Sequence, residues 1–206
     1  MLYLNNEGDK VFIINLKCCF STFETMTKEN KTRKITKKYM NDRIDTNVVS
    51  GWKKVLMLDP YIIVRNPYKK LYSFYYDKFV VNINNPPYDN QLSQITMQNY
   101  VPIEKLKEHK FTFDDFLETI KKGYKDDHII PQSILYKYYK FKKPVTILKV
   151  EDNFDERLSE LLNLKRSDIS HSNSHTYELE LTENQKRFIY ETYKDDFINF
   201  GYDKEF

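Results

Sequence analysis

The stretch FIINLKCCFSTFET at residues 12–25 decides the fold. It continues a run, VFIIN at 11–15, that is rich in β-branched residues and too short to favour a helix, so the run predicts a buried strand. Lys17 follows the strand, and Ser21 and Thr22 come four and five residues after it, where we expect a helix to begin near Phe20. A strand that turns directly into a helix is typical of an α/β protein.

Other apolar runs indicate further strands. YIIVR at 61–65 and VTILKV at 145–150 have the same character, and VLML at 55–58 is a weaker fourth. Helical patterns lie between and after them. Predicted helices start after Asn66–Pro67, at a capping box of Thr112 with Asp115, near Phe154, and at a capping box of Thr182 with Gln185; the last is expected to run as one helix to Gly201.

This alternation predicts one α/β domain over residues 1–206, with a mostly parallel central sheet flanked by helices. The polar stretch from Val80 to Tyr100 is expected to be a long loop or lid. Parallel sheets bind ligands outside the carboxyl ends of their strands. Lys17 and Arg65 both follow directly on predicted strands, so they are the first candidates for a binding site.

The charge and cysteine content limit the functional classes. Net charge is only +3, from 33 basic and 30 acidic residues, which argues against dominant nucleic-acid binding and allows a local anion pocket. The two cysteines, Cys18 and Cys19, are neighbours, so no disulfide framework is expected. No apolar run approaches the roughly 18 residues that cross a bilayer. We therefore expect a protein without a signal peptide or membrane span, in the cytoplasm or another reducing compartment.

A helix beginning near Phe20 places its unbonded N–H groups and positive dipole end beside Lys17, which predicts an anion site with the hydroxyls of Ser21 and Thr22 as added donors. The alternative is that Ser21 only caps a helix and Lys17 is a solvated edge residue. The glycines of a Walker A loop are missing.

A second anion site is indicated by IIVRNPYKKLYS at residues 62–73. Arg65 offers a planar set of donors suited to a phosphate monoester, and Ser73 lies two turns along the helix that follows. Two anion sites at neighbouring strand ends suggest one ligand with phosphate at both ends. An arginine paired with a helix and a serine on a polar face would give the same pattern without a function.

Taken together, these segments resemble the membrane-type carbohydrate sulfotransferases, a family that includes the chondroitin and heparan 2-O enzymes. The matching pieces, in the family's order, are LKCCFST at 16–22, RNPYKKLYS at 65–73, DHIIPQS at 127–133, VTILKVEDN at 145–153 and YKDDFINFGY at 193–202. The similarity therefore spans most of the chain. It implies a P-loop-like three-layer fold and transfer of a sulfonate group from 3′-phosphoadenosine 5′-phosphosulfate (PAPS) to an acceptor hydroxyl, with a carbohydrate as the expected acceptor and no metal.

The resemblance also implies residue roles. The loop Lys17, Cys18, Cys19, Phe20, Ser21 and Thr22 would hold the 5′-phosphosulfate, and Arg65 with Ser73 the 3′-phosphate. Cys19 stands where the family has a loop glycine, and Leu16 where it has a proline. Asn66 and Lys70 replace an aspartate and an arginine, which we expect to be cap and surface substitutions.

Sulfonate transfer needs a base for the acceptor hydroxyl, and His128 is the candidate because imidazole titrates near neutral pH. A structural loop histidine is the alternative. Glu151 is a candidate for orienting a base or acting as a helix cap, and Trp52 for stacking on a ligand or packing in the core. His171 and His175 are expected to lie in an ordinary polar loop, because two histidines alone are weak evidence for a metal site.

Two other functional classes stay open. One is a P-loop-like small-molecule kinase, which needs Mg²⁺-binding carboxylates near Ser21. The other is a nucleotide-binding module that has lost turnover, which the cysteine in the loop makes credible. The sequence alone leaves open the identity of the acceptor and the oligomeric state.

Overall fold

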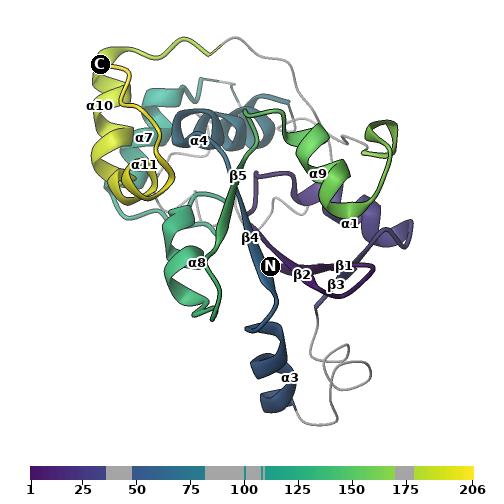
Figure 1. Ribbon diagram of the computed structural model, residues 1–206. Coiled ribbons are helices and arrows are strands. Elements are labelled where there is room, and N and C mark those ends of the chain that lie inside the picture. The colour runs from purple at the N-terminus through teal and green to yellow at the C-terminus, as the bar shows by residue number, and fades with distance from the viewer. Residues whose placement is uncertain (36–47, 82–99, 101–107, 109, 170–178) are drawn as a thin grey trace. The chain divides into compact units, whose positions relative to one another are not determined.

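The computed structural model describes residues 1–35, 48–81, 100, 108, 110–169 and 179–206. The chain divides into two compact units, and Figure 1 shows the elements of both. The first comprises Met1–Asn66 with Gln132–Ser174, and the second comprises Pro67–Pro131 with His175–Phe206. That residues 1–206 act as a single domain stays a prediction.

The first unit is built on a five-stranded sheet in the order β3-β1-β2-β4-β5. The strands are β1 (Leu2–Asn5), β2 (Lys10–Ile14), β3 (Thr32–Lys34), β4 (Asp59–Val64) and β5 (Thr146–Lys149). β4 pairs in parallel with both β2 and β5, whereas β1 pairs antiparallel with both β2 and β3. The three main predicted strands are confirmed. β1 and β3 were not predicted, and the antiparallel pairing of β1 makes the sheet mixed. The fourth predicted strand, 55–58, is wrong, because these residues form the end of a helix and a turn.

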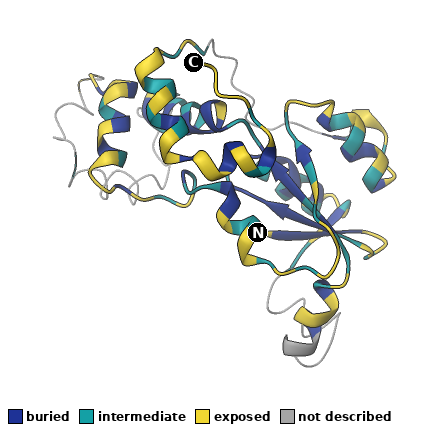
Figure 2. Ribbon diagram, turned by 60° about the vertical axis from the view of Figure 1, so that its left-hand side comes forward, coloured by how far each residue is buried: buried dark blue, intermediate teal, exposed yellow. Residues whose placement is uncertain are grey.

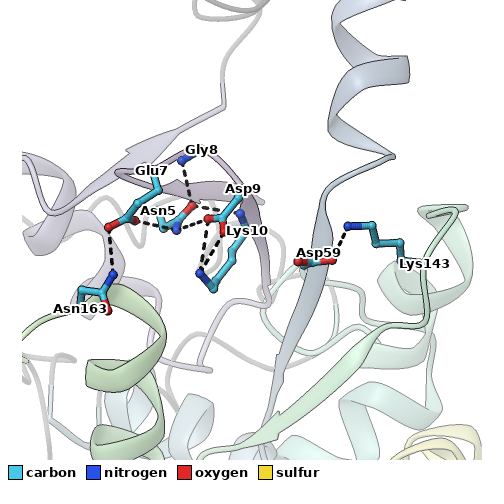
Figure 3. Close-up of polar contacts among 8 residues, drawn as sticks. All are labelled: Asn5, Glu7, Gly8, Asp9, Lys10, Asp59, Lys143 and Asn163. Carbon is cyan, nitrogen blue, oxygen red and sulfur yellow. Dashed lines mark hydrogen bonds and ion pairs between the residues drawn. The ribbon is translucent and has the colours of Figure 1, made fainter.

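A polar cluster at the end of β1 explains why this short strand forms although it contains only three apolar residues (Figure 3). The buried Asn5 side chain accepts the N–H groups of Gly8 at 3.1 Å and Lys10 at 3.0 Å, and it donates to the carboxylates of Glu7 and Asp9 at 2.8 and 2.6 Å. One amide therefore closes the whole turn between β1 and β2. Gly8 has a φ of 78°, which a glycine adopts without strain.

The helices of the first unit are α1 (Phe20–Lys28), α3 (Val48–Val55), α8 (Gln132–Tyr138) and α9 (Phe154–Leu162), with a short 3₁₀ turn, η3, at Arg166–Asp168. One core joins side chains of α1 and α9 to one face of the sheet, with Phe12 packed between Phe23 and Tyr61 at ring distances of 5.5 and 5.4 Å. The strands at the centre are buried, as Figure 2 shows in dark blue.

The second unit is helical in the part that the structure describes. Its elements are α4 (Pro67–Tyr75), a π-helix η2 (Tyr76–Val81), α7 (Phe113–Lys121), α10 (Glu183–Thr192) and α11 (Lys194–Phe200). Both predicted capping boxes are present, at Thr112 and at Thr182. The predicted single last helix is wrong, because it breaks at Tyr193, whose φ of −114° leaves the helical range. The predicted lid from Val80 to Tyr100 lies mostly outside the described residues.

Candidate functional site

The loop after β2 turns directly into α1, as the opening stretch predicts. It turns through two residues with left-handed backbone, Lys17 with φ 65° and Cys19 with φ 57°. The Cys18 N–H donates to the Asn15 carbonyl at 3.1 Å, and Phe23 N–H closes the first helical turn on the Cys19 carbonyl at 3.2 Å. Strand, tight turn and helix therefore follow one another within a few residues.

The amino end of α1 has the general geometry that attracts anions to the start of a helix. The first N–H groups of a helix have no acceptor within the helix itself. Cys19 makes no side-chain capping bond to them, and the first turn carries no acidic residue. Ser21 is the second residue of the helix rather than its cap, so the interpretation of Ser21 as a simple helix cap is wrong. Thr22 is buried, and Phe20 is half-buried beside the Lys34 ammonium, 5.5 Å from its ring.

Arg65 brings the end of β4 against this loop. Its guanidinium Nη1 donates to the Lys17 carbonyl at 3.3 Å. The two residues that the sequence selects at neighbouring strand ends therefore lie together on one edge of the sheet. Asn15, the residue after β2, adds a second tie by donating its amide to the Ile63 carbonyl at 3.3 Å.

Gln132 is the residue that locks these loops together. Its side chain is fully buried. Its Oε1 accepts the Arg65 N–H at 2.8 Å and the Cys18 thiol at 3.1 Å, while its Nε2 donates to the Arg65 carbonyl at 2.8 Å. A single amide thus satisfies both backbone groups of Arg65 and holds Cys18 inward. Sequence reasoning gave Gln132 no role, although the signal was present in DHIIPQS, where a polar residue directly follows a proline at the start of a helix.

The end of β5 joins the same edge. Glu151 Oε1 accepts the Asn66 N–H at 2.9 Å, one residue before α4 begins. This contact resembles a helix cap, so Glu151 acts here on the backbone at the end of β4. All three parallel strands therefore end in loops that hydrogen bonds tie together.

The thiol of Cys19 stays protonated in this loop. Burial, together with the neighbouring Cys18, raises the pKa of Cys19 to about 12, although the Arg65 charge acts in the opposite direction. The thiol is therefore neutral at physiological pH. The anion-attracting charge at the loop comes from Lys17, Arg65 and the α1 terminus, since Cys19 adds no negative charge.

The other two predicted site residues belong to the second unit. Ser73 lies half-buried on α4. His128 Nδ1 lies 2.6 Å from Asp126 Oδ1, and the same oxygen accepts the His128 backbone N–H at 2.7 Å. The imidazole also stacks on the Phe74 ring, with centroids 5.5 Å apart. A carboxylate only accepts hydrogen bonds, so Nδ1 is the nitrogen that donates here, and in the neutral form of the ring Nε2 carries the lone pair.

Comparison with known protein families decides what this arrangement belongs to. The model of the sulfotransferase family matches residues 9–203, which is nearly the whole chain. The chain belongs to the sulfotransferase family. No curated protein and no solved structure gives a significant match. Membership makes the protein a transferase of the sulfotransferase class, and the matched range contains every candidate site residue named above.

Asp126 is a partner of the candidate His128 that sequence reasoning missed. The motif drew attention to Asp127, but the partner of His128 is Asp126, whose second oxygen accepts the Tyr124 hydroxyl at 3.4 Å. An aspartate two residues before a histidine is the available signal, because a tight turn lets its carboxylate reach both the ring and the backbone.

Lys70 corrects another expectation. It is not a surface substitution, because it is only 3% exposed and its ammonium donates to the Ile130 carbonyl at 2.5 Å. Through this bond α4 holds the segment that follows His128.

Several candidates lie elsewhere or outside the described residues. Trp52 does not pack in the core; it is 37% exposed on α3, the helix before β4. His171 and His175 lie outside the described residues. In the part of the sulfotransferase that is described, no helix is long and apolar enough to cross a membrane, and no group of three or more potential ligands could hold a metal ion.

Proposed function

We propose that this sulfotransferase moves a sulfonate group from PAPS to a hydroxyl of an acceptor, with a carbohydrate as the acceptor class. The observation that carries the proposal is the contact of Arg65 with the Lys17 loop, which gathers two cations and a helix terminus at one edge of the sheet. The strand, turn and helix at residues 10–28 support the P-loop-like three-layer fold that this activity implies.

The residues at this edge fit a doubly phosphorylated nucleotide. Their side chains supply donors and positive charge: the Lys17 ammonium, the Arg65 guanidinium and the Ser21 hydroxyl. We assign the 5′ end of the donor to the loop from Lys17 to Thr22, and its 3′-phosphate to Arg65 with Ser73. When bound, PAPS supplies the sulfonate group that is transferred.

The chain's own residues then have distinct tasks. Lys17 and the first N–H groups of α1 stabilise negative charge on the oxygens they hold, because these donors are fixed before the reaction begins. His128 accepts the proton of the acceptor hydroxyl at Nε2, and Asp126 keeps the Nδ1 proton in place and stabilises the resulting imidazolium. The molecule that receives the sulfonate group needs no charge of its own, because the proton transfer to His128 requires only a hydroxyl.

Binding of the desulfonated product, 3′-phosphoadenosine 5′-phosphate, tests the proposal most directly. At 100 times its dissociation constant it should stabilise the protein by about 2.7 kcal/mol, or roughly 5–10 °C in melting temperature, and ADP much less. Arg65→Ala and Lys17→Ala should each weaken binding about 10- to 150-fold, the worth of a charged hydrogen bond. Arg166→Ala, which removes an exposed arginine in the same unit, is the matched control.

Three outcomes separate the functional classes. Mass-spectrometric detection of an added sulfonate on one of a panel of sugars would establish the enzyme. Stabilisation by ATP with Mg²⁺ but not by the 3′-phosphorylated nucleotide would favour the small-molecule kinase. Binding with no transfer to any sugar, metabolite or tyrosine peptide would favour a module without turnover.

A further inference from the structure

Two surface segments of the first unit carry lysine without any carboxylate. Residues 48–58 and 132–149 contain seven lysines and no aspartate or glutamate, in a chain whose net charge is only +3. Six of these lysines have exposed side chains: Lys53, Lys54, Lys137, Lys140, Lys142 and Lys143. These two segments therefore carry a local net charge of +7.

The two segments are adjacent in the fold. The Lys142 N–H donates to the Leu56 carbonyl at 2.9 Å, which joins the loop after α8 to the turn after α3. Next to this bond Lys143 pairs with Asp59 at 2.5 Å, as Figure 3 shows. We call the exposed residues of 52–57 and 134–143 the basic-apolar surface.

Large apolar side chains are exposed on both of these adjoining segments. Trp52 is 37% exposed, Met57 57% and Tyr138 72%, and Ile134, one helical turn before Tyr138, is 49% exposed. Among the described residues, these make up four of the eight exposed large apolar side chains. Exposed apolar residues that gather in one place mark an interaction site, whereas single ones are ordinary.

We propose that the basic-apolar surface docks on an anionic lipid membrane. Clusters of four to eight basic residues beside apolar and aromatic side chains are typical of segments that lie on anionic bilayers. Trp and Tyr prefer the depth of the lipid headgroups, and Met57 and Ile134 supply aliphatic surface that enters the boundary of the acyl chains.

A soluble anionic polysaccharide fits the surface less well. Sulfate and carboxylate groups are bound best by the planar donors of arginine, and all six exposed cations here are lysines. A sugar polymer also gains little from aliphatic side chains such as Met57 and Ile134. The composition therefore favours a diffuse attraction to a charged bilayer.

Docking in this way leaves the proposed catalytic edge free. α3 leads into the amino end of β4, and the loop after α8 leads into the amino end of β5 (Figure 1). Lys17 and Arg65 lie at the carboxyl ends of β2 and β4, about 20 Å away along a six-residue strand. Membrane binding and nucleotide binding are therefore expected to be independent.

Trp52 is the only tryptophan of the chain and is a built-in probe. The full chain is mixed with vesicles of about three parts phosphatidylcholine to one part phosphatidylserine, and with pure phosphatidylcholine vesicles. We expect co-sedimentation with the anionic vesicles alone, lost at high salt, a blue shift of the tryptophan emission, and quenching by brominated acyl chains. The double variant Lys53→Gln with Lys54→Gln should lower the partition coefficient about 25-fold, at about fivefold per lysine.

A matched control is the adjacent exposed pair Lys121→Gln with Lys122→Gln, at the end of α7 in the second unit, which should bind vesicles like the wild type. An equal loss in both double variants would overturn the assignment to this surface. So would tryptophan emission that responds to a soluble sulfated polysaccharide and not to anionic vesicles. Binding of 3′-phosphoadenosine 5′-phosphate should be unchanged in the Lys53 and Lys54 variant, so failure of the membrane proposal is separable from failure of the proposed function.

Discussion

Replacing Gln132 by methionine tests how the candidate site is held together. Methionine has nearly the same length and volume, so the change removes the hydrogen bonds of the amide without opening a large cavity. The lost contacts are those with the Arg65 N–H at 2.8 Å, the Arg65 carbonyl at 2.8 Å and the Cys18 thiol at 3.1 Å. The backbone of Arg65 then has to find other partners or stay unsatisfied.

The expected loss follows from counting these contacts. Each ordinary hydrogen bond contributes about 1 kcal/mol net, and a buried group left unsatisfied costs about 1–3 kcal/mol. The thiol bond is weak and adds little. Two backbone contacts therefore predict a destabilisation of about 2–4 kcal/mol, or roughly 4–16 °C in melting temperature for a protein of this size.

Urea unfolding of Gln132→Met against wild type measures this loss, and calorimetric titration with 3′-phosphoadenosine 5′-phosphate measures the effect on the site. Binding should weaken at least tenfold, because Arg65 and the Lys17 loop no longer share a fixed geometry. Gln185→Met, which removes a half-buried capping glutamine of α10, is the control and should cost about 1 kcal/mol without affecting binding. If Gln132→Met unfolds within about 0.5 kcal/mol of wild type and binds equally, the hydrogen bonds of Gln132 do not position this site.

Three further predictions follow from individual contacts. Asp126→Asn should lower kcat about 10- to 1000-fold with little change in KM, because His128 loses the carboxylate that fixes the orientation of its ring; an unchanged kcat would remove Asp126 from the reaction. Lys70→Met should cost about 1–3 kcal/mol in urea unfolding by leaving the Ile130 carbonyl without its donor, whereas a stabilised variant would show that burial of the charge outweighs the bond. Cys19, whose pKa is raised to about 12, should resist iodoacetamide at neutral pH, with a labelling rate that still rises above pH 10; rapid labelling at neutral pH would contradict a protonated thiol. Because the thiol loses its proton more easily in the unfolded chain, the folded protein should also lose stability as pH rises above about 9.

The fold was predictable where a short stretch of sequence is enough to determine the local structure. Buried strands such as β2 and β4 are continuous apolar runs, and the capping boxes at Thr112 and Thr182 are local motifs that need no distant partner. β1 was missed because its pairing depends on the side chain of Asn5, which closes a turn that no strand pattern reports. The break at Tyr193 was missed because the apolar spacing continues through it.

The sequence predicted the cations of the candidate site, but not the residues that hold them and His128 in place. Lys17 and Arg65 are found by asking which residues follow strands, a rule that depends on topology alone. Gln132 and Asp126 act through contacts made after the chain has folded, Gln132 across a separation of 67 residues from Arg65 and Asp126 within a turn whose geometry the sequence does not state. Lys70 looked like a surface residue because its burial depends on how α4 packs.

The loop cysteine of this sulfotransferase stands where the carbohydrate sulfotransferases that the sequence resembles have a glycine. Cys19 has a φ of 57°, the backbone region in which glycine has no steric cost and other residues lose roughly 1–2 kcal/mol. The loop therefore keeps the turn that glycine would give, and the strain is offset locally: Phe23 N–H bonds to the Cys19 carbonyl, and the neighbouring Cys18 thiol is held by Gln132. What differs from a glycine is the side chain, which is half-buried and uncharged. Cys19→Gly should accordingly leave the path of the loop unchanged, and a variant that bound the 3′-phosphorylated nucleotide markedly more tightly would show that the thiol, and not the backbone, limits the approach of the ligand.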